Sequence, residues 1–193
     1  QDTRRAVSRV GGTPCGIKTN EGTHGSGVFL AHTEQQARQL VYQMLERGLR
    51  PLVQEYIRES HGQDIRAFVV GGKVVASMRR KAKGSEFRSN FHLGGEVEKL
   101  SITGEYAEIA CKAAEILGLE IAGVDMLESE RGPLVLEVNS SPGLEGIEAA
   151  SGVNVANRII NNLASLYKSR HEAEEKQLLP RSQSGDEEAK GKA

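Results

Sequence analysis

The chain has 193 residues, of which 38% are hydrophobic and 26% charged, so it can bury a core and is not expected to be disordered throughout. Its formal net charge of −1 argues against a general nucleic-acid-binding protein, which usually carries a basic excess. Its apolar runs fall short of the ~20 residues that a membrane helix needs, and its two cysteines lack metal-type spacing and fit a reducing compartment such as the cytoplasm.

Hydrophobic periodicity divides the chain into strands and helices. Gly71 and Gly72 lie between two β-rich runs and are a strong hairpin signal. Thr33 and Thr103 suit helix N-caps because a threonine hydroxyl can accept an amide of the first turn. The expected elements, in chain order, are strands over 17–19 and 28–31, a helix over 34–47, strands over 52–57, 65–70 and 73–78, a helix over 103–117, strands over 122–127 and 134–138, and a helix over 155–167. This mixture, with its antiparallel hairpins, predicts an α+β fold rather than a parallel doubly wound sheet.

The most specific feature is a set of three oxygen-bearing side chains, Asp125, Glu137 and Asn139. Glu137 and Asn139 are two residues apart on an expected strand and therefore point to the same face, and Asp125 on the preceding strand can face them. Two carboxylates and an amide suit a hard divalent cation such as Mg²⁺, with substrate phosphates completing its coordination. The same spacing also fits a hairpin whose polar face is simply solvated, and spacing alone leaves both interpretations open.

Three weaker features also suggest phosphate or nucleotide chemistry. Lys18 precedes a glycine-rich segment over 21–27 that lets the backbone approach a phosphate, although it is not a Walker motif and also fits a flexible surface turn. The basic run over 79–90 can bind phosphate or carboxylate oxygens, or it can be a solvated loop. The strand over 54–57, followed by Asp64, can face an adenine and a ribose, or it can be an ordinary strand with an exposed turn.

Taken together, these motifs resemble the RimK-type ATP-grasp alpha-L-glutamate ligases. The resemblance runs from about residue 10 to 164 and is carried by Val53-Gln54-Glu55-Tyr56-Ile57, Asp64-Ile65-Arg66, Arg79-Arg80-Lys81-Ala82-Lys83, Phe87-Arg88-Ser89-Asn90, Ala122-Gly123-Val124-Asp125 and the run from Leu136 to Ile147. It implies an ATP-grasp fold with part of the small lobe over 1–57, the large lobe over 58–170, and a polar, disordered tail over 171–193. Because the sequence starts at Gln1 without a leader, we expect it to lack the family's amino-terminal domain.

The resemblance also implies a role for each motif. ATP and two Mg²⁺ or Mn²⁺ ions are the implied cofactors. The implied ATP-binding residues are Lys18 for the phosphates, Glu55, Tyr56 and Ile57 for the adenine, Asp64 for the ribose, and Arg88, Ser89 and Asn90 for phosphate or substrate. The implied metal ligands are Asp125, Glu137 and Asn139. Arg80, Arg88 and Asn90 are implied in catalysis, with Arg80 and the Ser141-Pro142-Gly143 loop near the acceptor.

The implied reaction is the ATP-dependent addition of L-glutamate to the C-terminus of a small-subunit ribosomal protein through an acyl phosphate. Two alternatives stay open at this point. A RimK-like ligase can act on another acceptor, such as a cofactor, an amino-acid carrier protein or a peptide, and a truncated chain can be an inactive nucleotide-binding fragment. Neither a nucleic acid nor a membrane is an expected partner, and the sequence is compatible with a homo-oligomer.

Overall fold

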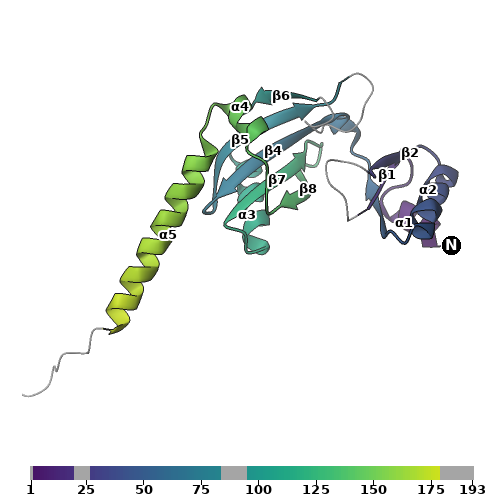
Figure 1. Ribbon diagram of the computed structural model, residues 1–193. Coiled ribbons are helices and arrows are strands. Elements are labelled where there is room, and N and C mark those ends of the chain that lie inside the picture. Colours follow the sequence, from purple (N-terminus) through teal and green to yellow (C-terminus); the bar gives the residue numbers. More distant parts are fainter. Residues whose placement is uncertain (1, 20–26, 84–94, 179–193) are drawn as a thin grey trace, which may run out of the picture. The chain divides into compact units, whose positions relative to one another are not determined.

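The computed structural model describes residues 2–19, 27–83 and 95–178 (Figure 1). The chain forms two compact units, Gln1–Val155 and Ala156–Ala193. The first unit contains two antiparallel β-sheets with their helices, and the described part of the second belongs to one long helix. No described helix combines the length and the apolar composition that crossing a membrane requires.

The N-terminal sheet has three antiparallel strands in the order β2-β1-β3, namely β1 (Cys15–Thr19), β2 (Phe29–Ala31) and β3 (Pro51–Glu55). The core between the strands and the helices α1 (Asp2–Arg9) and α2 (Glu34–Glu46) consists of Val7, Cys15, Ile17, Ala31, Ala37, Val41 and Met44. The predicted N-cap of α2 is confirmed, because the Thr33 hydroxyl accepts a hydrogen bond of 3.2 Å from the backbone N–H of Gln36. This small lobe places Lys18 on its central strand, opposite Leu52 of β3.

The second sheet has five strands in the order β6-β5-β4-β7-β8, and each strand is antiparallel to its neighbours. The strands are β4 (Gln63–Val70), β5 (Lys73–Lys81), β6 (Glu96–Lys99), β7 (Ile121–Leu127) and β8 (Leu134–Asn139). The predicted β4–β5 hairpin is confirmed, and its two turn residues Gly71 and Gly72 have φ values of 58° and 71°. Glycine is favoured there because residues other than glycine rarely adopt positive φ.

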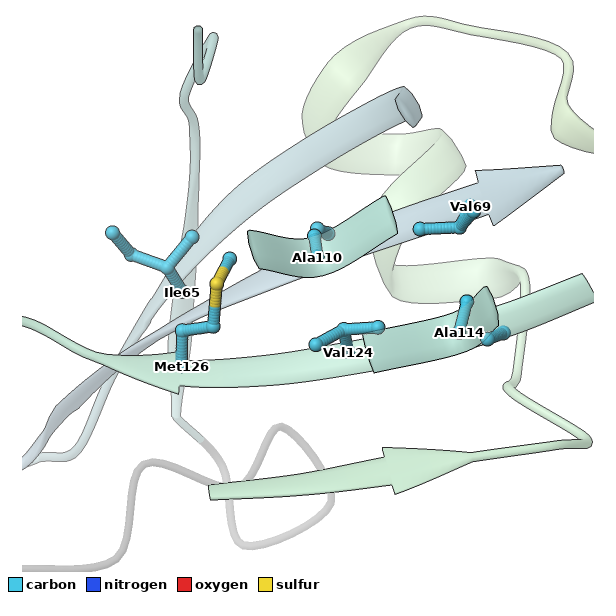
Figure 2. Packing of buried hydrophobic residues seen from close by; sticks show 8 residues of the cluster. Ile65, Val69, Ala110, Ala114, Val124 and Met126 are labelled. Atoms are coloured by element: carbon cyan, nitrogen blue, oxygen red, sulfur yellow. The ribbon is translucent and has the colours of Figure 1, made fainter. Parts of the chain in front are cut away.

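Helix α3 (Glu105–Ile116) covers one face of this sheet and builds its core. Figure 2 shows Ala110 and Ala114 of the helix against Ile65 of β4 and Val124 and Met126 of β7. The small alanine side chains let the helix approach the sheet closely. Because side chains alternate along a strand, the residues between these apolar ones point to the other face of the sheet, and that face carries the charged residues described below.

Several predicted boundaries differ from the structure. The residue before α3 is Gly104, which has φ 56° and offers no side-chain cap, so the prediction that Thr103 caps this helix was wrong. The strand expected over 52–57 ends at Glu55 and gives way to a short 3-10 helix, Arg58–Ser60. Helices α1 and α4 (Glu145–Ser151) were not expected, since both are short and carry few buried apolar residues.

The C-terminal helix α5 runs from Val155 to Leu178, well past its expected end. The disorder expected after His171 is therefore incorrect for residues 172–178, while residues 179–193 lie outside the described part of the chain. The polar composition is misleading here because Glu, Lys, Gln and Ala are also strong helix formers. The apolar residues expected on one side of this helix include Ile160 and Leu163, which are 63% and 50% exposed.

Candidate functional site

A row of charged side chains crosses the second sheet on the face opposite α3. Strand pairing places Arg80 of β5 beside Asp64 of β4, Arg66 of β4 beside Asp125 of β7, and Asp125 beside Glu137 of β8. The row therefore joins four neighbouring strands. Its members that are most distant in the sequence, Asp64 and Glu137, are more than 70 residues apart. Only the order of the strands in the sheet brings the members of the row together.

Asp125 is the centre of this row and is held by two arginines. Arg66 donates from Nε to Oδ1 and from Nη2 to Oδ2, both at 2.7 Å, and Arg80 donates from Nη2 to Oδ2 at 2.7 Å. Arg80 also donates from Nε to Oδ1 of Asp64 at 2.6 Å, with a second bond from Nη2 to Oδ2. Side chains of this kind are rarely buried unless they are paired, and here each carboxylate accepts from a complete guanidinium edge.

Burial and pairing act in opposite directions on the charged forms of these groups. Burial alone would raise the pKa of Asp125, but the charges and hydrogen bonds of Arg80 and Arg66 outweigh it and hold that pKa below its ordinary value. Burial alone would lower the pKa of Arg80, but Asp125 and Asp64 raise it above the ordinary value. Asp125 and Arg80 are therefore both charged at neutral pH.

Glu137 behaves differently from its neighbour Asp125. Burial, followed by the adjacent Asp125 carboxylate, raises the pKa of Glu137, and the positive charges of Lys18 and Arg66 act against this shift. A cation bound beside Glu137 would favour its charged form, because the cation would offset burial and the repulsion from Asp125.

Asn139 and the loop that follows β8 border the same row. Asn139 pairs with Gly123 across β7 and β8, and its Oδ1 accepts a hydrogen bond of 2.8 Å from the backbone N–H of Ser141. Pro142 of the loop lies directly over Gly123, where an added Cβ would be 2.8 Å from the Cβ of Pro142. The Ser141-Pro142-Gly143 loop can lie this close to the sheet only because position 123 has no side chain.

The segment over 55–57, predicted to face the adenine, is hydrogen-bonded through Glu55 to the turn between β7 and β8. Arg131 of that turn donates from Nη2 to both carboxylate oxygens of Glu55 at 2.8 Å, and the hydroxyl of Ser60 donates to the backbone carbonyl of Glu128 at 2.6 Å. The hydroxyl of Tyr56 is hydrogen-bonded to His61, and the side chain of Ile57 is buried. Their predicted contact with adenine remains a prediction.

The structure brings together five of the predicted site residues, Asp64, Arg80, Asp125, Glu137 and Asn139. Three others, Arg88, Ser89 and Asn90, lie outside the described residues. Sequence reasoning assigned no role to Arg66, although it belongs to the quoted Asp64-Ile65-Arg66 motif. Its two-residue spacing from Asp64 on one strand was the available signal, since that spacing puts both side chains on the same face.

The chemistry of the donor set fits a magnesium ion. Glu137, Asn139 and Asp125 present oxygen atoms from two paired strands, and Mg²⁺ commonly takes one or two carboxylates together with waters and substrate phosphates. Among the described residues, no group of three or more acidic, histidine or cysteine side chains converges as a complete metal cage. A site that relies on phosphate oxygens to complete its coordination accords with both observations.

Comparison with known proteins identifies the family. The sequence profile described as the RimK-like ATP-grasp domain matches residues 1–163. The chain belongs to this family. It is also 53% identical over 162 residues to a protein of Aeromonas salmonicida named "Probable alpha-L-glutamate ligase", an alignment that covers 84% of this chain and 54% of that relative. The chain thus spans about half the length of the curated RimK-like relatives that it matches.

Solved structures support the ATP-grasp fold. The D-alanine–D-alanine ligase from Bacillus anthracis matches with a TM-score of 0.64 and 18% identity, over 86% of this chain and 59% of that one. The ATP-grasp ligase PsnB, in a complex with a phosphomimetic precursor variant, Mg and ADP, matches with a TM-score of 0.62 and 23% identity, over 85% and 49% of the two chains. The predicted α+β ATP-grasp class is thereby confirmed for this RimK-like chain.

Proposed function

We propose that this RimK-like chain is the ATP- and metal-binding part of a ligase that joins the amino group of L-glutamate to a carboxylate. The observation that carries the proposal is the match of residues 1–163 to the RimK-like ATP-grasp domain, together with curated relatives named as glutamate ligases. The row of paired charges beside Glu137 and Asn139 supports the same chemistry, because phosphoryl transfer depends mainly on positioning and charge stabilisation.

ATP and Mg²⁺ are the proposed cofactors. Glu137 and Asn139, with Asp125 behind them, would hold Mg²⁺, which would neutralise the charge of the phosphates. The structure of PsnB contains Mg and ADP, which supports the assignment for a chain of the same fold. A second metal ion, and Mn²⁺ in place of Mg²⁺, are finer parts of this proposal, because Mn²⁺ takes the same oxygen ligands as Mg²⁺.

The proposed reaction has two steps. A carboxylate oxygen of the acceptor attacks the γ-phosphorus of ATP, the bond to the ADP oxygen breaks, and an acyl phosphate forms. The unprotonated amine of glutamate then attacks the acyl carbon and the C–O bond breaks. Phosphate leaves with the electrons of that bond and takes up the proton that the amine loses as the amide forms. Neither step needs a nucleophile from the protein. Lys18, Arg80 and the segment over 88–90 are proposed to bind and orient the reacting oxygens.

The proposed acceptor is the C-terminus of a small-subunit ribosomal protein, and the proposed location is the cytoplasm. Both follow from the likeness to RimK. The alternative acceptor is a cofactor, a carrier protein or a peptide. The region of the relatives that this chain does not span would help to select among these acceptors. If this piece binds ATP–Mg²⁺ without ligation, it is a nucleotide-binding module of a larger ligase.

The metal assignment can be tested with Glu137→Gln. Because burial and Asp125 raise the pKa of Glu137, a neutral glutamine imitates its protonated form, and we expect the fold to tolerate the change. The loss of a charged ligand should weaken Mg²⁺-dependent ATP binding, measured by titration calorimetry, by about 10-fold or more. Glu108→Gln is the matched control, since this side chain is exposed on α3, and it should bind as the unaltered chain does.

The reaction itself is tested by incubating the chain with ATP, Mg²⁺, L-glutamate and a panel of acceptors. A mass gain of one glutamate residue on an acceptor, together with ADP release, is the expected result. ATP–Mg²⁺ binding without any mass gain across the panel would reject ligation by this piece and leave the nucleotide-binding module. If the unaltered chain failed to bind ATP–Mg²⁺, the proposed function would be wrong.

A further inference from the structure

We propose that the turn between β7 and β8, residues 128–133, positions the segment over 55–57 for the adenine of ATP, with Arg131 as its positioning residue. This inference rests on the proposed function, which places the adenine against that segment. It adds a part of the chain to which the motifs gave no role. It follows from the way in which the turn holds the connection between the two sheets.

The segment over 55–57 lies where the chain passes from one sheet to the other. Strand β3 of the first sheet ends at Glu55, and β4 of the second sheet begins at Gln63. Residues 56–62 therefore form the connection between the two sheets. The position of the segment over 55–57 depends on whatever holds this connection in place.

Arg131 of the turn is bonded to the last residue of β3. Its Nη2 donates to both carboxylate oxygens of Glu55 at 2.8 Å. The two side chains are 59% and 47% exposed, so salt can screen the pair and its contribution to overall stability is small. Because Glu55 is the first residue of the segment proposed to face the adenine, the pair acts on the course of that segment.

Two further hydrogen bonds hold the part of the connection that follows. The backbone N–H of Glu130 donates to Oε1 of Glu59 at 3.2 Å. The hydroxyl of Ser60, which is buried, donates to the backbone carbonyl of Glu128 at 2.6 Å. The segment over 55–57 is thus held at its first residue and again just beyond its end, each time by the same turn.

The turn is itself fixed to the second sheet. The hydroxyl oxygen of Ser129 donates to the backbone carbonyl of Gly132 at 2.7 Å and accepts from the backbone N–H of Arg131 at 3.1 Å. At the start of the turn, Nη2 of Arg79 in β5 donates to Oε2 of Glu128 at 2.8 Å. These bonds let the turn act as an anchor that belongs to the second sheet and holds the end of a strand of the first.

The adenine and the phosphates of ATP should respond differently when this anchor is lost. The adenine is proposed to lie against the segment over 55–57, whereas the phosphates are proposed to lie at Lys18 and the metal ligands. A segment that moves more freely must be ordered when the adenine binds, which costs affinity. The phosphates keep their own partners. A loss confined to the adenosine part of ATP is the result that a general weakening of the fold would not give.

The first experiment compares ATP–Mg²⁺ with tripolyphosphate–Mg²⁺, which lacks the adenosine, by calorimetric titration. Arg131→Glu sets a like charge against Glu55 and should weaken ATP–Mg²⁺ binding by about 5-fold or more, but tripolyphosphate–Mg²⁺ binding by less than about 2-fold. Combining it with Glu55→Arg exchanges the two charges and should recover most of the ATP affinity. Lys112→Glu is the control for net charge, because Lys112 pairs with Glu115 at the same 2.8 Å on the exposed side of α3.

The second experiment uses the unaltered chain and so does not depend on how a variant folds. Amide hydrogen exchange, followed by peptide mass spectrometry, compares a peptide over 55–62 with one from β4. Raising the salt from about 0.1 M to about 1 M shortens the Debye length from about 10 Å to about 3 Å and weakens exposed ion pairs. Exchange over 55–62 should therefore become faster relative to β4.

Three results would overturn the inference while the proposed function stands. They are an unchanged ATP–Mg²⁺ affinity in Arg131→Glu, an equal loss for both probes, and an exchange ratio that does not change with salt. If the unaltered chain binds no ATP–Mg²⁺, the proposed function and the inference fail together.

Discussion

Gly123→Ala is the substitution whose cost the structure defines most directly. The new Cβ would lie 2.8 Å from the Cβ of Pro142, whereas carbon atoms pack best at about 3.5–4.0 Å, so the loop would have to withdraw by roughly 0.7 Å or more. Overpacking typically costs about 1–3 kcal/mol, and replacing a strand glycine by alanine returns about 0.5–1 kcal/mol. The midpoints of these two ranges differ by roughly 1.3 kcal/mol, which is the expected net loss in the free energy of unfolding and can be measured by urea denaturation.

A matched substitution separates this steric effect from the general effect of removing a glycine. Gly16 also lies in a strand, and an alanine Cβ there would meet its nearest neighbour, Gln54, at 3.7 Å, an ordinary contact. Gly16→Ala should therefore leave stability unchanged or raise it by up to about 1 kcal/mol. Displacing Pro142 should also weaken ATP–Mg²⁺ binding in Gly123→Ala, because Asn139 is hydrogen-bonded to the same loop. Equal stability of the two variants would refute the close approach of Pro142.

Three further predictions concern buried ionisable groups. Asp125→Ala should cost about 3–5 kcal/mol in unfolding free energy, since it leaves the buried Arg80 and the half-buried Arg66 short of a partner. A loss below about 1 kcal/mol would contradict the pairing of Asp125 with these two arginines. The pKa of Asp125 is lower in the folded chain than in the unfolded chain. Its contribution to stability is therefore complete above the unfolded pKa of about 3.9 and is lost as the pH falls towards the folded value. Urea denaturation at decreasing pH should show a shallower loss of stability for Asp125→Asn than for the unaltered chain. Burial raises the pKa of the Cys15 thiol, and iodoacetamide should therefore label the partly exposed Cys111 before Cys15 in the native chain, a difference that unfolding in urea should remove.

Local chemistry made much of the fold predictable. The β4–β5 hairpin follows from Gly71 and Gly72, because few other residues tolerate positive φ at two successive positions, and helix α2 follows from its apolar spacing and the Thr33 cap. Prediction failed where the local signal was weak or ambiguous. The start of α3 was assigned to Thr103 because threonine is a good N-cap, but the chain enters that helix through Gly104.

For the site, the two-residue spacing of Glu137 and Asn139 was enough to place both on one face of a strand, and the hairpin placed Asp125 beside them. The sequence alone could not show that Asp125 would be gripped by Arg66 and Arg80. Those contacts depend on the order β5-β4-β7-β8, which is set by how the strands pack around α3 and not by any short-range preference.

The sequence by itself determined the RimK-like family, the strands that carry the candidate ligands and the oxygen chemistry that they offer, because side-chain identity and strand periodicity are local properties. The tertiary structure alone decided which charges meet. It joined Asp64, Arg80, Asp125 and Arg66 into one row of alternating charges, and it placed Pro142 over Gly123. Long-range pairing of this kind is fixed by the burial of apolar surface elsewhere in the sheet, and the charged residues follow from it.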